Sequence, residues 1–313
     1  MAFDFLKEEV RDDFFVDIKR KKIWAVEVEL LQELLRVCNK YGLKCFVQGG
    51  TLLGTIRHKG FIPWDDDLDV ALCREDYDKL CEVAPQEFSE PYFFQNALSD
   101  RNYFIGISRL RKSTTTGIVT FLSDRVYNNG IYIDIYVYDK VPEDTKELKK
   151  LIRKVKIYET RLDNYYHVNT HNPKIRPFAW VLKFQRLFIS YEKLFKKYQS
   201  VCKSYSNKET NKLGFLCMPY FMKYFATVSG TSNLIEKNFE YFKVLVPSDY
   251  DFMLKSAYGD YMKFPPIEER GKWHEDVIIF NPDISYLEYY ELHKDKYKKV
   301  LRDYRRMERK NRR

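Results

Sequence analysis

The feature that most constrains this chain of 313 residues is a cluster of acidic side chains directly before an apolar run. Asp65, Asp66, Asp67 and Asp69 precede "VALC" at 70–73. If a strand begins at residue 65, alternation places Asp65, Asp67 and Asp69 on one face. Asp66 then points to the other face. Carboxylates about 6 Å apart repel by roughly 3 kcal/mol per pair at an effective dielectric constant near 20. A divalent cation would remove that penalty.

The residue types in this cluster predict a particular kind of cation. All-oxygen ligands suit Mg²⁺, Mn²⁺ or Ca²⁺ better than zinc. An EF-hand calcium loop is excluded, because it needs glycine at position 70 and normally glutamate at position 76, where the chain has Val70 and Asp76. The plain alternative is that these aspartates only cap a turn or line a solvated loop.

A pair of glycines about sixteen residues earlier points to phosphate. In "FVQGGTLLG", at 46–54, a strand passes into Gly49 and Gly50 and then into an expected helix, with Thr51 as its cap. Glycines allow close backbone approach, and the amide groups at the start of a helix attract phosphate. Alone this signal is weak, because paired glycines usually make a turn.

A third signal is an acid inside an apolar strand. In "GIYIDIYVYD", at 130–139, Asp134 lies between Ile133 and Ile135 and therefore faces away from both. From there it can meet the acidic cluster across an adjacent strand. A strand, a Gly-Gly turn into a helix, an acid-x-acid strand and a later acid together resemble the nucleotidyltransferase superfamily, in which such acids hold metal ions against nucleotide phosphates.

Periodicity divides the chain into two parts. Helical spacing is found at 17–41, where Gly42 can stop the helix, and at 74–84, 143–168 and 178–205. β-Branched and aromatic runs predict strands at 43–48, 70–73, 92–95, 103–110 and 131–138. We expect an α/β fold with a nucleotidyltransferase-like mixed β-sheet core, flanked by helices, over 1–142. We expect a mostly helical region over 143–313 that completes the active site, packed as one unit with the core.

Composition excludes several classes of protein. The first residues mix charged and apolar groups and lack the continuous apolar core of a secretory signal. No window approaches the roughly 18 apolar residues needed to span a bilayer. We therefore expect a cytoplasmic protein. The six cysteines and five histidines show no metal-ligand spacing, which predicts reduced thiols and no zinc site.

The net charge of +9 comes partly from the basic stretch at 293–313, "HKDKYKKVLRDYRRMERKNRR". Such a tail suits anionic lipid, a polyanionic glycan or nucleic acid. No nucleic-acid module accompanies it, so no nucleic acid is expected as a partner. The plain alternative is a solvated helix end.

The motifs together resemble one family closely. "GGTLLGTIRHKGFIPWDDDLDV", at 49–70, is similar to the LicD family, the phosphocholine transferase group that also includes the fukutin-related proteins. The family typically continues to a Y-I-D-I strand, here 132–135, and to a second block, here "YGDYMKFPPIEERGKWH" at 258–274. The resemblance covers about 40–140 and 239–280. After the Y-I-D-I strand the chain has Tyr-Val where the family often has Phe-Pro.

The resemblance implies a reaction and a cofactor. The reaction is transfer of phosphocholine, or a related phospho-alcohol, from CDP-choline or another CDP-alcohol to a hydroxyl of a cell-surface glycan such as lipopolysaccharide or teichoic acid, with release of CMP. Asp67 and Asp69 fall on the metal-binding acid pair and Asp134 on the third acid, with Mg²⁺ or Mn²⁺ as the cofactor. Asp134 is also the better candidate for the general base. A lipid-linked glycan acceptor would account for the basic tail as a peripheral contact at the inner face of the membrane.

Residues inside the motif blocks are candidates for binding substrate. They are Gly49, Gly50, Thr51, Arg57, Lys59, Trp64, Asp65, Arg270 and His274. Choline needs aromatic faces, because a quaternary ammonium ion donates no hydrogen bond. The aromatic candidates are Trp64, Trp273, Tyr258 and Tyr261. Arg109 and Arg111 either contact phosphate or carry ordinary surface charge.

Two other functions remain open on the sequence. One is an NTP-dependent nucleotidyltransferase that acts on a small molecule or sugar, for which the acid triad would be the same. The other is a non-catalytic, cation-dependent protein that binds glycan or nucleotide. Release of CMP or of pyrophosphate separates the first from the phosphocholine transferase, and loss of activity on replacing Asp69 argues against the second.

Overall fold

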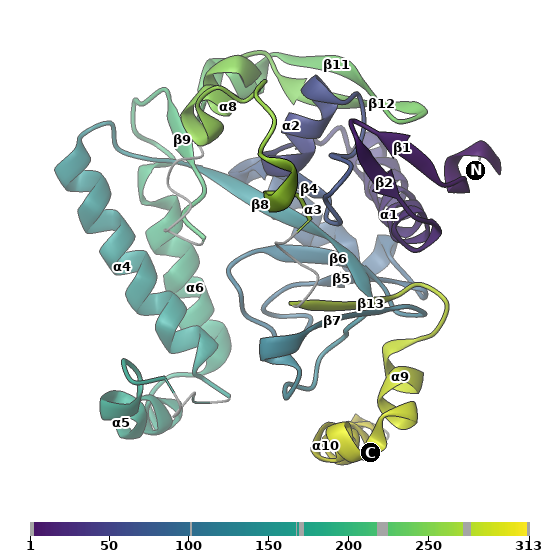
Figure 1. Ribbon diagram of the computed structural model, residues 1–313. Coiled ribbons are helices and arrows are strands. Elements are labelled where there is room, and N and C mark those ends of the chain that lie inside the picture. Colours follow the sequence, from purple (N-terminus) through teal and green to yellow (C-terminus); the bar gives the residue numbers. More distant parts are fainter. Residues whose placement is uncertain are drawn as a thin grey trace.

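The computed structural model describes residues 3–100, 102–166, 168, 172–217, 225–271 and 277–311 (Figure 1). The described α-helices are α1 (Ile18–Tyr41), α2 (Gly49–Arg57), α3 (Arg74–Glu87), α4 (Thr145–Asp163), α5 (Ala179–Phe184), α6 (Tyr191–Cys202), α7 (Val228–Ser232), α8 (Tyr250–Tyr258), α9 (Tyr286–Leu292) and α10 (Lys294–Asn311). The described strands are β1 (Glu9–Arg11), β2 (Phe14–Val16), β3 (Cys45–Val47), β4 (Asp69–Cys73), β5 (Tyr92–Gln95), β6 (Ser108–Lys112), β7 (Thr116–Val119), β8 (Ile131–Lys140), β9 (Lys212–Gly214), β10 (Phe225–Thr227), β11 (Leu234–Phe239), β12 (Phe242–Pro247) and β13 (Ile278–Asn281).

The core is a mixed sheet built around the long strand β8. Its strands follow the order β10-β9-β8-β4-β3, and β6 with β5 joins the same sheet through β8. β4 runs parallel to β8, whereas β6 and β9 run antiparallel to it. β8 is rich in the β-branched and aromatic residues that favour a strand. The expected α/β fold, with a mixed sheet flanked by helices, is confirmed.

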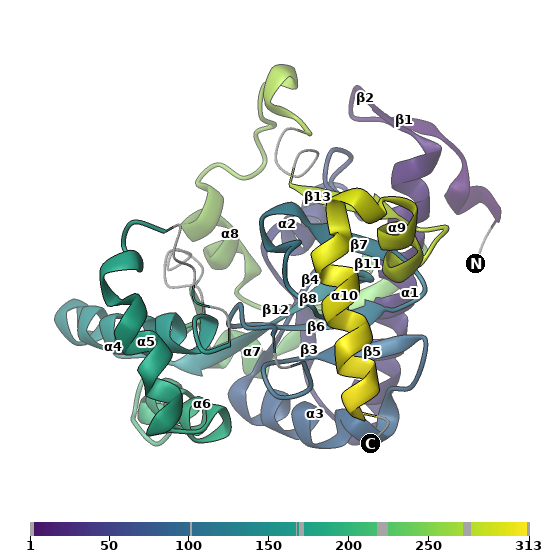
Figure 2. The same ribbon diagram turned by 90° about the horizontal axis from the view of Figure 1, so that it is seen from below.

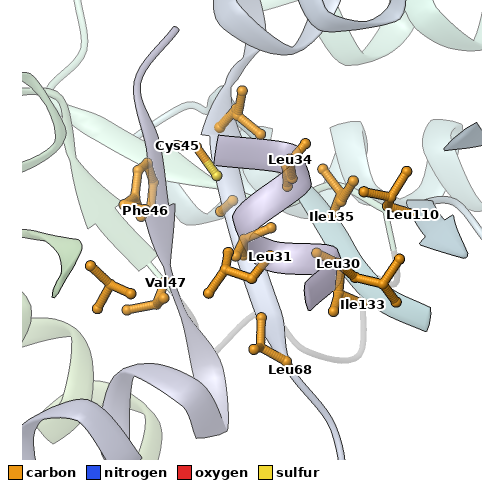
Figure 3. Packing of buried hydrophobic residues seen from close by; sticks show 14 of the residues in the cluster. Leu30, Leu31, Leu34, Cys45, Phe46, Val47, Leu68, Leu110, Ile133 and Ile135 are labelled. Atoms are coloured by element: carbon orange, nitrogen blue, oxygen red, sulfur yellow. The ribbon is translucent and has the colours of Figure 1, made fainter. Parts of the chain in front are cut away.

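The helix α1 covers one face of this sheet. Figure 3 shows Leu30, Leu31 and Leu34 of α1 packed toward Ile133 and Ile135 of β8. Both isoleucines are fully buried. Because side chains alternate along a strand, the residue between them faces the opposite side of the sheet. The helix therefore fixes which face of β8 is left for polar chemistry.

The boundaries of several elements were predicted closely. α1 ends at Tyr41, and Gly42 caps it in the left-handed conformation with φ +65°, as the sequence predicts. The strand expected at 103–110 begins only at Ser108. The expectation that Thr51 caps α2 is wrong, because the helix starts at Gly49 with Gln48 as its N-cap and Thr51 lies inside it.

The expected strand through the acidic cluster is also wrong in extent. The segment 65–68 is not part of a strand, although the Leu68 carbonyl oxygen accepts from the backbone N–H of Asp134, and β4 begins only at Asp69. Three of the four residues at 65–68 are aspartates, and the low strand propensity of aspartate is consistent with their absence from β4. Strict alternation of side chains therefore does not apply before Asp69.

The second part of the chain contributes to the same sheet. Helices dominate it, and α4 and α6 pack side by side beyond the edge of the sheet (Figure 1). β9 and β10 extend the central sheet, while β13 pairs with β7. Hydrogen bonding of the central sheet thus crosses the expected boundary at residue 142, although the division into two domains stays a prediction.

Two expectations from composition can be compared with the structure. All six cysteines are unpaired, and four of them are buried, which agrees with reduced thiols. Within the described ranges, none of the helices combines the length and the apolar character needed to cross a bilayer.

Candidate active site

Two acids lie opposite each other on neighbouring strands. Asp69 opens β4, and the parallel register places it opposite Asp134 of β8. Asp69 is 9% exposed, and its Oδ1 atom has no hydrogen-bond partner among the residues that the structure describes. The prediction that Asp134 meets the acidic cluster across an adjacent strand is therefore confirmed.

Backbone contacts fix the acidic cluster in place. Trp24 Nε1 and Arg20 Nη1, both from α1, donate to the carbonyl oxygen of Asp65 at 2.9 and 3.0 Å. On the other side, the backbone N–H of Asp69 donates to Thr51 Oγ1 at 2.8 Å. Thr51, predicted to bind substrate, thus holds the strand that carries the acid.

The carboxylates of the cluster raise one another's pKa. Burial, with the charges of Asp65 and Asp69, raises the pKa of Asp67 well above its usual value. Burial, with the charges of Asp134 and Asp65, does the same to the pKa of Asp69. Such mutual repulsion is the property that the sequence predicted for the cluster.

Gly49 and Gly50 make room for these carboxylates. Gly49 has φ +58°, and a Cβ atom there would lie 2.8 Å from Asp69 Oδ2. A Cβ atom on Gly50 would lie 2.9 Å from Asp65 Oδ2. Both distances are too short for an ordinary contact. The glycines therefore permit a close approach of acidic side chains, and their contact with phosphate stays a prediction.

A cavity of about 760 Å³ opens beside the acidic cluster, within the size range of small-molecule sites. Its walls come from segments far apart in sequence. The acidic lining residues are Asp65, Asp66, Asp67, Asp69 and Asp260. The aromatic ones are Trp64, Tyr136, Phe215, Tyr258, Tyr261 and Phe264. Asp66, which was expected on the opposite face from its acidic neighbours, lines the same cavity as they do.

The second motif block, 258–274, reaches this cavity through its described residues. Arg57, at the end of α2, donates from Nη1 to the carbonyl oxygen of Tyr261 at 2.8 Å. Its guanidinium lies 4.9 Å from the centroid of the Phe264 ring. Arg57 also lines the cavity. It therefore joins the two motif blocks and stays a candidate for binding phosphate.

Arg270 lies beside the cavity and does not line it. Its Nη1 donates to the carbonyl oxygen of Asp12 at 2.8 Å, and its Nε to that of Pro265 at 3.1 Å. The guanidinium lies 4.5 Å from the centroid of the Trp64 ring. These contacts hold a cavity wall in place.

Three other candidates lie apart from the cavity or outside the described residues. Lys59 is exposed in a turn with φ +58°, and its carbonyl oxygen accepts from the backbone N–H of Glu240. His274 and Trp273 lie outside the described residues. Their predicted roles stay predictions.

Sequence reasoning missed a buried acid beside the cluster. Glu27 of α1 is 0% exposed, and neither of its carboxyl oxygens has a hydrogen-bond partner among the described residues. Burial and the charges of Asp66, Asp65 and Asp69 raise its pKa well above the usual value. The signal was available, because Glu27 follows Ile23 by four residues on the apolar face predicted for this helix.

Sequence reasoning also missed the role of two arginines. Arg109 of β6 donates from Nε to Asp134 Oδ1 at 2.6 Å, in a nearly buried pair. Arg111, also buried, donates to Gln95 Oε1 and to the carbonyl oxygen of Gly130. Ordinary surface charge is therefore wrong for both. Only the strand register, which places Arg109 opposite Asp134, shows the first of these partnerships.

The acidic cluster offers oxygen ligands to a divalent cation. In the part of the chain that the structure describes, no three His, Cys, Asp or Glu side chains form a ready-made metal cage. Mg²⁺, however, usually binds one or two carboxylates together with substrate phosphates and water. The unpartnered Oδ1 of Asp69, opposite Asp134, supplies hard oxygen of this kind. The residues present therefore fit Mg²⁺ or Mn²⁺.

Comparison with known proteins identifies the same region. The family model described as "LicD/FKTN/FKRP, nucleotidyltransferase domain" matches residues 42–179. The chain is 28% identical over 250 residues to the lipopolysaccharide cholinephosphotransferase LicD of Haemophilus influenzae, covering 79% of this chain and 92% of that protein. It is also 31% identical over 118 residues to an uncharacterised protein of Rickettsia prowazekii, covering 37% of this chain and 40% of that protein.

The family match spans the Gly-Gly turn, the acidic cluster and Asp134, which are the residues that carried the resemblance. The relative from Haemophilus influenzae extends the similarity over most of the chain. The resemblance is therefore confirmed, since residues 42–179 match the model of the LicD/FKTN/FKRP nucleotidyltransferase domain and most of the chain is similar to a LicD protein.

Proposed function

We propose that this protein transfers phosphocholine, or a related phospho-alcohol, from a CDP-activated donor to a hydroxyl of a cell-surface glycan such as lipopolysaccharide, and releases CMP. The observation that carries the proposal is the cavity in which the acidic cluster and aromatic side chains meet. The acids suit a phosphate-bound cation, and the aromatic faces suit a quaternary ammonium group. Similarity to a lipopolysaccharide cholinephosphotransferase supports the same reaction.

Asp67, Asp69 and Asp134 would hold Mg²⁺ or Mn²⁺ on the nucleotidyltransferase-like core. When bound, the cation supplies charge neutralisation and polarisation of the phosphoryl oxygens. Arg109 orients the Asp134 carboxylate through its hydrogen bond to Oδ1. Arg57 lines the cavity and can compensate phosphate charge from the other motif block.

Asp134 is the proposed general base. It accepts the proton of the acceptor hydroxyl while the hydroxyl oxygen forms a bond to the phosphorus that carries choline. The bond between that phosphorus and the bridging oxygen of the pyrophosphate breaks, and the electron pair leaves with CMP. Trp64, Tyr258 and Tyr261 line the cavity and are the proposed contacts of the choline head group.

The test measures CMP release from CDP-choline, CDP-ribitol and CDP-glycerol, with a glycan extract as acceptor, with and without Mg²⁺ or Mn²⁺. The variant is Asp69→Asn, and the matched control is Asp283→Asn, an exposed aspartate paired with Lys22. We expect metal-dependent release of CMP from one donor. Asp69→Asn should lower the rate by at least about a hundredfold. Loss of a group that only orients a metal ligand costs up to about a hundredfold, and loss of a ligand itself should cost no less.

Three results would contradict the proposal. Pyrophosphate release from an NTP, with every CDP-alcohol left intact, would favour the NTP-dependent nucleotidyltransferase. Full activity of the Asp69→Asn protein would remove the acidic cluster from the reaction. Binding of glycan without turnover of any donor would favour the non-catalytic reading.

A further inference from the structure

One short segment of the chain exposes a group of large apolar side chains. We name residues 174–188 the aromatic segment, which consists of α5 with the flanking 3-10 turns Arg176–Phe178 and Gln185–Leu187. Its most exposed apolar residues are Phe178, Trp180, Phe184, Leu187 and Phe188, each between 56% and 85% exposed. Apolar groups that gather on a surface in this way mark an interaction site.

The aromatic segment is anchored to the body of the protein by its inner side. Leu182 and Gln185 are buried. Gln185 Nε2 donates to the carbonyl oxygen of Arg161, and Arg161 Nε donates to Gln185 Oε1, both at 3.1 Å. Because Leu182 and Gln185 are fixed on the inner side, the exposed apolar residues around them are held on the outer side.

The charges of the aromatic segment all have one sign. Lys174, Arg176, Lys183 and Arg186 are exposed, and the sequence from 172 to 191 contains no aspartate or glutamate. Apolar and aromatic residues interspersed with lysine and arginine are the composition of helices that lie in a membrane interface. Tryptophan is also enriched at that level of the bilayer.

The basic helix α10 lies on the same side of the molecule. In Figure 1 both α5 and α10 are at the lower edge, and Figure 2 shows both from that side. α10 buries Tyr297, Val300 and Leu301 against the protein. Its exposed basic residues include Lys298, Arg302 and Arg306. One side of the molecule thus combines exposed apolar groups with two basic elements.

We propose that the aromatic segment is a membrane-docking site, which places its apolar side chains in the headgroup region of an anionic bilayer while its cations and α10 contact the lipid phosphates. Charge complementarity selects this occupant. A second copy of the chain would bring four further cations against the same four, whereas an anionic lipid surface neutralises them. The site differs from the basic tail expected from the sequence, because apolar insertion at residues 174–188 provides a contact that salt does not screen.

Membrane docking does not depend on the proposed transferase activity. Binding to a vesicle requires neither a donor nor turnover, so loss of docking and loss of transferase activity are measured separately. Among the described residues that line the acidic cavity, none belongs to the aromatic segment.

The test is flotation of the full-length protein with vesicles of phosphatidylcholine alone or mixed with phosphatidylglycerol, at low and high salt. The variant is Trp180→Ser/Phe184→Ser, and the matched control is Phe252→Ser, an aromatic residue of α8 that is 52% exposed. We expect the wild type to float with the anionic vesicles. The double variant should bind the anionic vesicles at least about tenfold more weakly, and the control should bind as the wild type does. If the double variant loses thermal stability, Leu187→Ser/Phe188→Ser replaces it.

Several outcomes would overturn the proposal. One is equal flotation of wild type and double variant with anionic vesicles, which would leave the aromatic side chains without a role. Another is no flotation of the wild type with either lipid mixture. A third is a lipid-free wild-type dimer that the double variant converts to a monomer, which would show that a second copy covers this surface.

Discussion

Glu27 is a buried acid whose ionisation works against folding. Its two carboxyl oxygens have no hydrogen-bond partner among the described residues, and three aspartates of the acidic cluster face it. Because its folded-state pKa lies above the ordinary value of 4.5, the folded protein binds more protons than the unfolded chain. Stability is therefore unaffected by Glu27 well below that value and falls as the pH rises toward the folded pKa.

Replacing this side chain by its neutral isostere should stabilise the protein. We expect Glu27→Gln to raise the free energy of unfolding by up to about 3 kcal/mol near neutral pH, because the amide is neutral in both states, whereas the carboxylate costs about 1.4 kcal/mol for each pH unit above its ordinary pKa. The gain should shrink as the solution is acidified toward the ordinary pKa of glutamate. Urea denaturation across that pH range measures both effects.

The control for this prediction is Glu29→Gln on the same helix. Glu29 accepts hydrogen bonds from Tyr92 and Lys112, so its replacement should lower stability at neutral pH. A Glu27→Gln protein that is less stable than the wild type at neutral pH would show that the carboxylate has a stabilising partner in solution.

Arg109 and Asp134 form a buried ion pair, and removal of either side chain should destabilise the protein. Arg109 Nε donates to Asp134 Oδ1 at 2.6 Å, and the two side chains are only 7% and 13% exposed. Removing one partner of a buried ion pair costs about 3–5 kcal/mol, because the other charge stays buried and uncompensated. We expect Arg109→Leu to lower the free energy of unfolding by about that amount, measured by urea denaturation.

The double variant Arg109→Leu/Asp134→Leu distinguishes the cost of an unpaired buried charge from the cost of lost packing, because it removes both charges. It should recover part of the loss, because no unpaired charge remains. Strictly additive effects of the two single substitutions would mean that the two groups do not interact in solution. Transferase activity is expected to be lost in either variant that lacks Asp134.

At the scale of elements, the sequence predicted what depends on local periodicity. α1 and β8 follow from apolar spacing and β-branched runs, and the position of Asp134 followed from alternation along β8. The start of α2 and the conformation of 65–68 were predicted wrongly. Both depend on contacts with distant residues, such as the hydrogen bonds from Trp24 and Arg20 to the Asp65 carbonyl oxygen.

The turn between β3 and α2 offers a test of how closely the backbone must approach the acids. Gly49 has φ +58°, and a Cβ atom would lie 2.8 Å from Asp69 Oδ2. Gly42 has a similar φ of +65°, but a Cβ atom there would meet no atom of the described residues within 4 Å. The two glycines therefore share a left-handed backbone conformation, which would be strained for alanine, and differ in their contact with the acidic cluster.

We expect Gly42→Ala to cost about 1–2 kcal/mol of stability, the strain of a left-handed residue, and to keep full activity. Gly49→Ala should cost more and should also lower transferase activity, because Asp69 must move. Thermal unfolding and CMP release measure the two effects. Equal activity of the two variants would show that the space beside Gly49 is not needed by the acid.

At the scale of the whole molecule, the candidate site is assembled from segments that no local pattern connects. Phe215 and the block at 258–271 join residues 48–69 and Tyr136 around one cavity. Family resemblance pointed to the second block, but the partnership of Arg57 with Tyr261 follows only from the packing of α2 against the chain that leaves α8. The surroundings of Glu27 also could not be predicted from a local pattern, since the aspartates near it are far away in the sequence.

A cation bound by this assembly should stabilise the whole fold. A ligand that binds the folded state alone raises the apparent stability in proportion to the logarithm of its concentration above the dissociation constant. We expect MgCl₂ to raise the Tm, by about 2–4 °C for each kcal/mol of linkage. NaCl at equal ionic strength should not. Asp69→Asn should abolish the shift, and the surface variant Asp283→Asn should keep it.

The same measurement gives the sign of the pH dependence. The pKa values of Asp67 and Asp69 are both raised, so protons compete with a cation for these carboxylates over a range that begins above the ordinary aspartate pKa. The Tm shift caused by MgCl₂ should therefore decrease as the pH is lowered. A shift that is independent of pH, or that persists in Asp69→Asn, would place the cation elsewhere on the protein and would remove the physical reason for gathering these acids at one end of β4.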